Sequence, residues 1–201
     1  DRVLLSDGRG RILNGDIMLW VLGRWLASEG RLGSGVVATV MSNMALEEHL
    51  GKEGIPVYRC QVGDRYVMET MNGKGSLLGG EQSGHVIISS VANTGDGICT
   101  GLFFLEACQA IGEEIETLAD RFSPYPQILR NVPIPRESKA DSIFLSELTA
   151  ETEPMLDGGG RVFIRPSGTE PLIRILVEAR DQKLMEKVSN LLESTIRERY
   201  S

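Results

Sequence analysis

The amino-acid sequence predicts an α/β fold in two parts: a three-layer domain built on a mostly parallel sheet, then a small α+β domain with an antiparallel sheet. Up to residue 124, predicted strands alternate with predicted helices, and several strands are continuous apolar runs, as in sheets that are buried on both faces. After the proline-containing segment 123–126 the alternation stops, and the pattern becomes that of antiparallel strands with two helices. We therefore expect domains at 1–124 and 125–201.

Each predicted element of the first domain is an apolar pattern bounded by a turn or by a capping residue. Residues 7–10, Asp-Gly-Arg-Gly, separate two short apolar runs and predict a hairpin. Asp16, Ser42 or Asn43, and Asp96 are the expected helix caps. The expected strands span 3–6, 11–13, 36–40, 57–62, 76–79 and 85–89. The expected helices span 16–28, from 43 to about 51–54, 64–71, 97–111 and 114–122.

The second domain is expected to contain three strands and two helices. Strands are predicted at 127–134, 162–164 and 172–177. Ser138 or Asp141 opens a helix that continues to about residue 153, and Asp181 caps the last helix. Apolar residues at helical spacing predict one buried stripe on that last helix, made of Leu184, Val188, Leu191, Leu192, Thr195 and Ile196.

The composition is that of an ordinary globular protein, with 201 residues of which 41% are hydrophobic and 24% are charged. A net charge of −7 disfavours nucleic-acid binding, which requires a basic face, and no apolar run is long enough for a membrane span. No Cys-x-x-Cys pair occurs, so Cys60, Cys99 and Cys108 are expected to be buried, reduced thiols of a cytoplasmic protein. His49, among charged neighbours, is expected to be a solvated surface residue.

A polar loop at residues 165–171, Arg-Pro-Ser-Gly-Thr-Glu-Pro, lies between the last two predicted strands. We call it the Arg165 loop. Arg165 offers a planar set of donors, Ser167 and Thr169 offer hydroxyls, and Gly168 permits a close approach by a ligand. These groups suit a phosphate dianion, through charge-assisted hydrogen bonds and backbone amides. The alternative is an ordinary hairpin loop with a surface Arg, and the residues alone leave both interpretations open.

A second loop at residues 80–85, Gly-Glu-Gln-Ser-Gly-His, is called the Glu81 loop here. Glu81, Ser83 and His85 alternate, so an extended loop would point their side chains the same way. A carboxylate and a hydroxyl can bind sugar hydroxyls, and His85 can contact an oxygen or a phosphate. The alternative is a turn in which Glu81 and Ser83 act as caps and His85 begins a strand.

The sequence resembles the α-D-phosphohexomutase family, and within it the bacterial glucosamine branch. Arg165-Pro-Ser-Gly-Thr-Glu-Pro-Leu-Ile-Arg174 is similar to the phosphate-binding loop of that family, and Gly80-Glu-Gln-Ser-Gly-His85 to its sugar-binding loop. Asp1-Arg2 resembles the end of its Asp-x-Asp-x-Asp-Arg metal loop. The match runs from residue 1 to about residue 180. The resemblance implies the C-terminal half of a longer enzyme, with residues 1–10 a remnant of the domain that carries the metal loop.

By this resemblance, the parent enzyme interconverts glucosamine 6-phosphate and glucosamine 1-phosphate through a phosphoserine and a hexosamine 1,6-bisphosphate, and it uses Mg²⁺. The resemblance implies that Glu81, Ser83 and His85 hold the sugar, and that His85 and Arg2 are candidate catalytic residues. Arg65, in the first turn of a helix, is a further candidate for a phosphate contact, with a solvent-exposed Arg65 behind an Asp64 cap as the alternative. The implied phosphate-binding residues are Arg165, Ser167, Gly168 and Thr169. Arg174, a few residues later, is a further candidate for a phosphate contact, with a pair to Glu170 or Glu178 as the alternative.

Two features limit what this chain is expected to do alone. By the same resemblance, Asp1 is one carboxylate of a three-carboxylate site, so the chain is not expected to bind Mg²⁺, which requires near-octahedral oxygen coordination. The Ser-His-Asn-Pro nucleophile signature of the family does not occur in the sequence, so the chain is expected to be inactive without the N-terminal domains of the same polypeptide. The alternatives are a sister mutase that acts on mannose or glucose phosphates, and a phosphosugar-binding module without catalysis.

Overall fold

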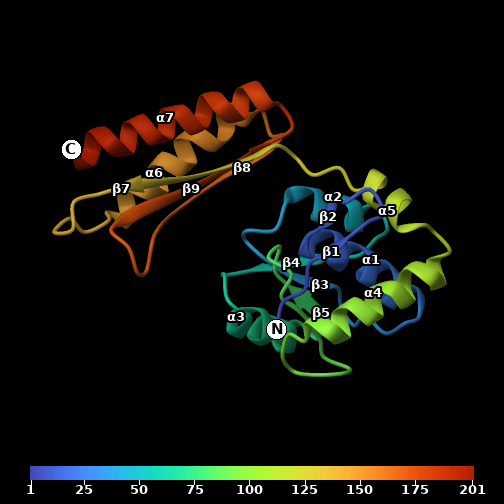
Figure 1. The fold of residues 1–201 in the computed structure, drawn as a ribbon. Coiled ribbons are helices and arrows are strands. Elements are labelled where there is room, and N and C mark those ends of the chain that lie inside the picture. Colours follow the sequence, from blue (N-terminus) through green and yellow to red (C-terminus); the bar gives the residue numbers. More distant parts are fainter. The chain divides into compact units, whose positions relative to one another are not determined.

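The computed structural model describes all 201 residues, which form two compact units, Asp1–Pro124 and Tyr125–Ser201 (Figure 1). Each unit has its own apolar core, and we describe each by itself. The first unit contains a two-stranded hairpin, a four-stranded sheet and five helices. The second contains a three-stranded sheet, two α-helices and one short 3₁₀ helix.

The main sheet of the first unit is mostly parallel, as the apolar strands predicted. Its strands are β3 (Val36–Thr39), β4 (Val57–Cys60), β5 (Leu78–Gly80) and β6 (Val86–Ile88). They lie in the order β4-β3-β5-β6; β3 pairs in parallel with β4 and β5, while β6 runs antiparallel to β5. Because β3, β4 and β5 point the same way, the loops that follow them meet at one edge of the sheet.

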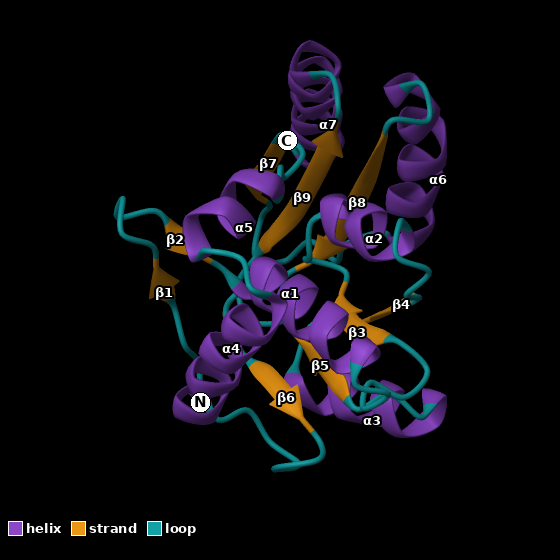
Figure 2. Ribbon diagram, turned by 90° about the vertical axis from the view of Figure 1, so that its right-hand side faces the viewer, coloured by secondary structure: helices purple, strands orange, loops and turns teal.

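Helices cover both faces of this sheet and make the predicted three layers (Figure 2). Along β3, Val36 and Ala38 belong to the larger core, whereas Val37 belongs to a smaller one on the opposite face, because successive strand residues point to opposite faces. The helices are α1 (Gly15–Ser28), α2 (Met44–Gly51), α3 (Asp64–Lys74), α4 (Gly97–Ile111) and α5 (Ile115–Arg121). Residues of α3 fill the smaller core, and residues of α1, α2, α4 and α5 fill the larger one.

The hairpin predicted at the start of the chain is present, as β1 (Leu5–Ser6) paired antiparallel with β2 (Ile12–Leu13). Its turn is closed by Asp7. One carboxylate oxygen accepts hydrogen bonds from the backbone N–H groups of Arg9 and Arg11, each at 2.9 Å. The other accepts from the Arg11 side chain at 2.6 Å. An Asp that bonds to the backbone two residues on is a usual way to stabilise a turn.

The second unit is the predicted antiparallel α+β fold. Its strands are β7 (Gln127–Pro133), β8 (Gly160–Pro166) and β9 (Leu172–Ala179), in the order β7-β9-β8. Its helices are α6 (Ser142–Thr152), the 3₁₀ helix η1 (Glu153–Leu156), which the sequence did not predict, and α7 (Gln182–Tyr200). Alternate residues of β9 point into the core with the apolar faces of α6 and α7: Ile173, Ile175, Val177 and Ala179.

Several helix starts differ from the prediction in which residue forms the cap. Asp96 and Asp181 cap their helices as expected, and Asn43 and Asp141 are the caps at the two ambiguous positions. Asp16 is not a cap. Asn14 caps α1 instead, by accepting from the backbone N–H groups of residues 16 and 17, and the Asp16 side chain is buried. Gly63 stands at the cap position of α3, so the alternative that Asp64 forms this cap was also wrong.

The buried stripe of α7 was only partly predicted. Val188, Leu192 and Ile196 are buried as expected, but Leu191 is 40% exposed and Thr195 is half-buried. Met185 and Ser189 are buried in their place. Each residue advances a helix by 100°, so Leu191 lies to one side of a stripe centred on Leu192. The sequence pattern could not place this centre, because apolar residues occur on both sides of it.

The cysteines are free thiols, as expected, although only Cys60 and Cys108 are buried and Cys99 is half-buried. Burial raises the pKa of the Cys60 thiol and of the Cys108 thiol to about 11 in each case. Both thiols therefore stay protonated at neutral pH and serve as small core residues. None of the helices combines the length and the apolar character that crossing a membrane requires.

His49 is not the solvated residue that its charged neighbours suggested. Its ring stacks on Phe122 with the ring centres 5.1 Å apart, and it meets Trp20 at 5.2 Å. The prediction was wrong because the neighbours in sequence lie on other faces of α2, while His49 faces residues of α1 and of the end of α5. Burial, followed by the positive charge of Lys52, lowers the pKa of His49.

Truncating Leu192 tests the observed stripe of α7. We expect Leu192→Ala to reduce the free energy of unfolding by about 2–5 kcal/mol, because it leaves a cavity in the core. Leu191→Ala is the matched control on the neighbouring residue and should change the free energy of unfolding by no more than about 0.5 kcal/mol. Urea denaturation of both variants measures the difference, and equal losses would contradict the stripe described here.

Replacing His49 with Phe tests whether burial lowers the pKa of His49. An unfolded His titrates near pH 6.5, whereas the folded His49 resists protonation, so lowering the pH below 6.5 favours the unfolded chain until the folded pKa is passed. The wild type should therefore lose stability over this interval as the pH falls, and His49→Phe should lose less. Denaturation curves at pH 7.5 and 5.0 give the comparison. Equal losses in the two proteins would contradict a lowered pKa of His49 in the folded chain.

Candidate functional site

The Glu81 loop is a tight turn that joins β5 to β6. The backbone N–H of Gly84 donates to the carbonyl of Glu81 at 3.0 Å, and the N–H of Glu81 donates to the carbonyl of His85 at 2.8 Å. Gly84 has φ 90°, a conformation that favours glycine. The extended loop that the alternation of residues suggested is therefore wrong. The turn still brings two of the predicted side chains together, because the Ser83 hydroxyl donates to Glu81 Oε2 at 3.0 Å.

The Glu81 carboxylate is held at the edge of the sheet where the parallel strands end. Its Oε1 accepts from the backbone N–H of Gly63, in the loop after β4, at 2.9 Å. The residue is 9% exposed. A carboxylate can accept about four hydrogen bonds, and the bonds from Gly63 and Ser83 occupy two of these positions. Further positions therefore remain for hydroxyl donors, at the edge where α/β proteins commonly bind ligands.

His85 lies with the first two residues of the chain. Its Nδ1 is 3.5 Å from a carboxylate oxygen of Asp1, and its backbone forms an antiparallel bridge with Arg2. His85 is 5% exposed, and its buried Nε2 has no hydrogen-bond partner. Gly95 covers the ring so closely that a Cβ there would lie 2.5 Å from it. The structure thus groups the three residues that the sequence singled out as catalytic or metal-binding candidates.

Arg65 is in the first turn of α3, as predicted. It is exposed and forms an ion pair with Glu69 at 2.7 Å, and the hydrogen bond with this carboxylate raises the pKa of Arg65. Arg65 borders a cavity of about 300 Å³, whose other lining residues are Asp64, Met68, Glu69, Asn72, Ile87, Asn93 and Thr94. The alternative of a solvent-exposed Arg65 agrees with this structure, although Asp64 is not the cap.

The Arg165 loop connects β8, an edge strand, to the central strand β9. The N–H of Ser167 donates to the carbonyl of Leu172 at 2.9 Å, and the Ser167 hydroxyl accepts from the N–H of Glu170 at 3.3 Å. Gly168 has an ordinary φ, and a Cβ on it would meet no atom within 4 Å. The backbone of this turn therefore does not require glycine, and the space above Gly168 is open.

Two arginines stand opposite each other at the base of this loop. Arg165 on β8 pairs in register with Arg174 on β9, a like-charge pair that destabilises a sheet. Arg174 bonds to the Glu170 carboxylate at 3.1 Å, but the Nε atoms of both arginines are buried and have no partner. Burial, followed by the charge of Arg174, lowers the pKa of Arg165. The pair therefore has the charge and the unused donors to bind an anion.

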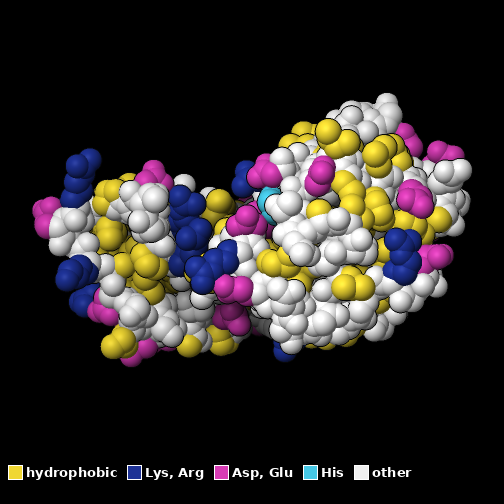
Figure 3. Space-filling view, turned by 90° about the horizontal axis from the view of Figure 1, so that it is seen from below, with side chains coloured by type: hydrophobic (Ala, Val, Ile, Leu, Met, Phe, Trp, Pro, Cys, Tyr) yellow, Lys and Arg dark blue, Asp and Glu magenta, His cyan; other side chains and the backbone are white.

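Lys and Arg side chains gather in patches on the face drawn in Figure 3, although the chain carries a net charge of −7. Local cationic patches are sufficient for a small anionic ligand, because screening by salt limits the effect of distant charges to about 10 Å.

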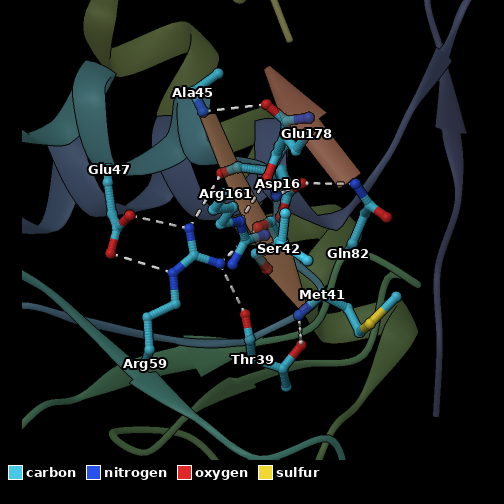
Figure 4. A network of polar contacts seen from close by, with 12 residues as sticks. Asp16, Thr39, Met41, Ser42, Ala45, Glu47, Arg59, Gln82, Arg161 and Glu178 are labelled. Atoms are coloured by element: carbon cyan, nitrogen blue, oxygen red, sulfur yellow. Dashed lines mark hydrogen bonds and ion pairs between the residues drawn. The ribbon is translucent and has the colours of Figure 1, made fainter. Parts of the chain in front are cut away.

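Sequence reasoning missed a buried polar network beneath the Glu81 loop (Figure 4). Asp16, fully buried, accepts through Oδ2 from the backbone N–H of Asn43 at 2.9 Å and from the Gln82 side chain at 3.0 Å. Burial raises the pKa of Asp16. Arg59 of β4 donates to the carbonyl of Thr39 at 3.0 Å and to the Glu47 carboxylate at 3.0 Å. The sequence did contain a signal for this network. Asn14 lies two residues before Asp16, and because only one of them can cap α1, the other is free for another role.

Comparisons with known proteins assign both units to one family. The model of the phosphoglucomutase/phosphomannomutase α/β/α domain III matches residues 14–125, and the model of the C-terminal domain of that family matches residues 113–192. The phosphoglucosamine mutase of Ruegeria pomeroyi is 46% identical over 198 residues, which are 96% of this chain and 44% of that protein. The phosphoglucosamine mutase of Methylobacillus flagellatus is 42% identical over 199 residues, which are 98% of this chain and 44% of that protein.

A solved structure shows the same fold at lower identity. The crystal structure of Aspergillus fumigatus N-acetylphosphoglucosamine mutase in complex with GlcNAc-6P and magnesium has a TM-score of 0.78 at 20% identity, and the match covers 100% of this chain and 47% of that one. The chain thus spans less than half the length of the relatives that it matches. It belongs to the phosphoglucomutase/phosphomannomutase family, of which it carries domain III and the C-terminal domain.

Proposed function

We propose that this chain is the substrate-binding half of a phosphoglucosamine mutase, an enzyme that interconverts glucosamine 6-phosphate and glucosamine 1-phosphate. In this proposal, a phosphoserine outside the chain transfers its phosphoryl group to the sugar, and the 1,6-bisphosphate returns the other one. The relatives that are 42% and 46% identical carry the name of this enzyme. The observation that carries the proposal is the opposed pair Arg165 and Arg174, whose buried Nε donors lack a partner.

The Arg165 loop is proposed to bind the phosphate that is not reacting. Arg165 and Arg174 supply the charge, while Ser167, Thr169 and the amides around Gly168 supply neutral donors. A dianion would remove the repulsion between the two guanidinium groups and would satisfy their free donors. The open space above Gly168 is consistent with a ligand that approaches the backbone closely.

The Glu81 loop is proposed to bind two neighbouring sugar hydroxyls, with Glu81 as acceptor and Ser83 as donor or acceptor. A mutase must hold its hexose in two orientations related by a half-turn, so that either C1 or C6 faces the reacting phosphoserine. The hydroxyls at C3 and C4 exchange places under that rotation. One Glu and Ser pair can therefore serve both orientations, which is a physical reason for such a pair.

The two compact units are proposed to be the functional domains, 1–124 with the Glu81 loop and 125–201 with the Arg165 loop. Such loops contribute to phosphoryl transfer by orienting the sugar and by neutralising charge, which account for much of the catalysis in this class of reaction. Arg65 remains a candidate for a further phosphate contact, competing with its ion pair to Glu69. Without the phosphoserine, the 201-residue chain is proposed to have no mutase activity.

Asp1, Arg2 and His85 are proposed to face the reacting phosphoryl group in the whole enzyme. Mg²⁺, which the family resemblance implies, would supply charge neutralisation there. The residues of this chain do not fit Mg²⁺ by themselves, because Asp1 offers one carboxylate and no group of three His, Cys, Asp or Glu side chains is close enough to hold a metal. His85 is proposed first to contact the ligand through Nε2, which has no hydrogen-bond partner, and second to act as a general acid or base.

A mutase that acts on mannose or glucose phosphates is the second candidate function, because it would use the same two loops. Gln82 makes the Glu81 loop similar to that of the glucosamine branch. It does not help to choose between the sugars, since its side chain bonds to the buried Asp16. Comparing turnover of the three sugar phosphates by the intact enzyme separates these candidates. A phosphosugar-binding module without catalysis is the third candidate, and detecting the nucleophile upstream in the gene would exclude it.

Removing Arg165 tests the phosphate site. We expect Arg165→Met to weaken binding of inorganic phosphate to the 201-residue chain by about 10- to 100-fold, the usual effect of one hydrogen bond to a charged group. The control is Arg197→Met, which removes the same charge from an exposed residue of α7 that is paired with Glu193. Isothermal titration calorimetry measures both. Equal affinities in the wild type and in Arg165→Met would contradict the assignment of this loop.

Removing the Glu81 carboxylate tests the sugar site. Glu81→Ala should weaken binding of glucosamine 6-phosphate by about 10-fold or more and leave the affinity for inorganic phosphate unchanged, because the carboxylate is proposed to contact only hydroxyls. The same titrations with both ligands measure the ratio of affinities. If both ligands lose affinity equally, or if neither does, Glu81 does not recognise the sugar.

A further inference from the structure

The Glu81 loop rests directly on the first turn of α1. The backbone N–H of Gly15 donates to the carbonyl of Gln82 at 2.9 Å. A Cβ on Gly15 would lie 1.9 Å from the carbonyl oxygen of Glu81 and 3.0 Å from the nitrogen of Gly84. No other residue type fits at 1.9 Å, since Cβ atoms essentially never come within 3.0 Å of another atom. The Glu81 loop therefore packs directly against residues 14–16.

Gln82 bonds to residues 14–16 through its side chain as well as through its backbone. Its amide donates to Asp16 Oδ2 at 3.0 Å, and the same oxygen accepts from the backbone N–H of Asn43 at 2.9 Å. Asn43 follows β3 and caps α2. One buried carboxylate oxygen thus holds the Glu81 loop, the loop after β3 and the start of α1 together (Figure 4).

Because the side chain of Gln82 is committed to this buried bond, the residues on either side of it have a defined position. Glu81 and Ser83 bond to each other, and Glu81 also bonds to Gly63 after β4. If Gln82 released Asp16, the loop would lose its side-chain bond to α1, and Asp16 would lose one of its donors inside the protein. A buried polar group with an unmade hydrogen bond is costly, so the anchored loop is strongly favoured.

We propose that Asp16 and Gln82 are positioning residues for sugar recognition: the bond between them fixes the geometry of Glu81 and Ser83. This inference rests on the proposed function of the Glu81 loop. It also assigns Gln82 a role without substrate contact, since its amide is used within the protein. Precise placement matters for such a site, because a displacement of about 1 Å can cost 100-fold in rate.

The test replaces Gln82 with Met, which has similar length and no hydrogen-bonding amide. Amide hydrogen exchange of the 201-residue chain should accelerate about 10-fold at Gly15, Gly63 and Gly84, whose N–H groups bond to this loop, and remain unchanged in the second unit. The matched control is Gln182→Met, since the Gln182 amide also donates to a carboxylate, that of Glu186, at 2.9 Å on an exposed surface. It should leave exchange at the three glycines unchanged.

Two variants of Asp16 show whether hydrogen bonding is the cause. Both donors converge on a single oxygen of Asp16, so the amide oxygen of Asn can replace it. Asp16→Asn should therefore preserve most of the protection at the three glycines, and Asp16→Leu should lose it. If Asn and Leu act alike, the hydrogen bond does not position the loop. Equal exchange in Gln82→Met and wild type would also overturn the inference.

Ligand titration separates this inference from the proposed function. Gln82→Met should weaken glucosamine 6-phosphate about 10-fold and inorganic phosphate not at all, as Glu81→Ala does. If Glu81→Ala weakens the sugar phosphate but Gln82→Met does not, the positioning role fails and the sugar site stands. If Glu81→Ala has no effect on the sugar phosphate, the proposed function of the loop fails, and the exchange data still decide whether Asp16 and Gln82 hold it.

Discussion

The geometry of the first unit depends on the parallel pairing of β3 with β4 and β5. Three parallel strands end at the same edge, so three loops that are distant in the sequence meet there. Loops have few apolar contacts of their own, and here two buried acceptors connect them. Asp16 binds the loop after β3 and the Glu81 loop, and Glu81 binds the loop after β4. The sheet brings the loops together, and the carboxylates determine their conformations.

The second unit builds its candidate site by the opposite electrostatic arrangement. At the edge of the parallel sheet, the carboxylates of Asp16 and Glu81 accept hydrogen bonds from donors of the protein. At the base of the Arg165 loop, two guanidinium groups stand opposite each other with donors left unused, and only Glu170 offsets their charge. An antiparallel hairpin makes such a pair possible, because residues in register lie about 5 Å apart on the same face. The stability that this pairing costs is consistent with a site arranged for an anion.

The similarity to known proteins differs between the fold and the two loops. At 42% and 46% identity, the curated relatives share the name phosphoglucosamine mutase, whereas at 20% identity the fold alone is shared, with a TM-score of 0.78. The sheet, its covering helices and the hairpin need only patterns of apolar and turn residues. The Glu81 and Arg165 loops need particular side chains at particular positions, and it is these residues that the sequence itself singled out.

The sequence by itself determined the fold class, most of the helices and strands, and the two loops, because apolar periodicity, caps and turn residues act over a few neighbouring positions. It did not determine which of Asn14 and Asp16 caps α1, that Leu191 lies outside the stripe of α7, or that the His49 ring packs against Phe122 and Trp20. It also could not show that Gln82 points at a buried carboxylate or that Arg165 faces Arg174. Most of these depend on residues that are far apart in the chain and adjacent only after folding. The pairing of Arg165 with Arg174 depends on the register of one hairpin, so it too was decided only by the folded structure.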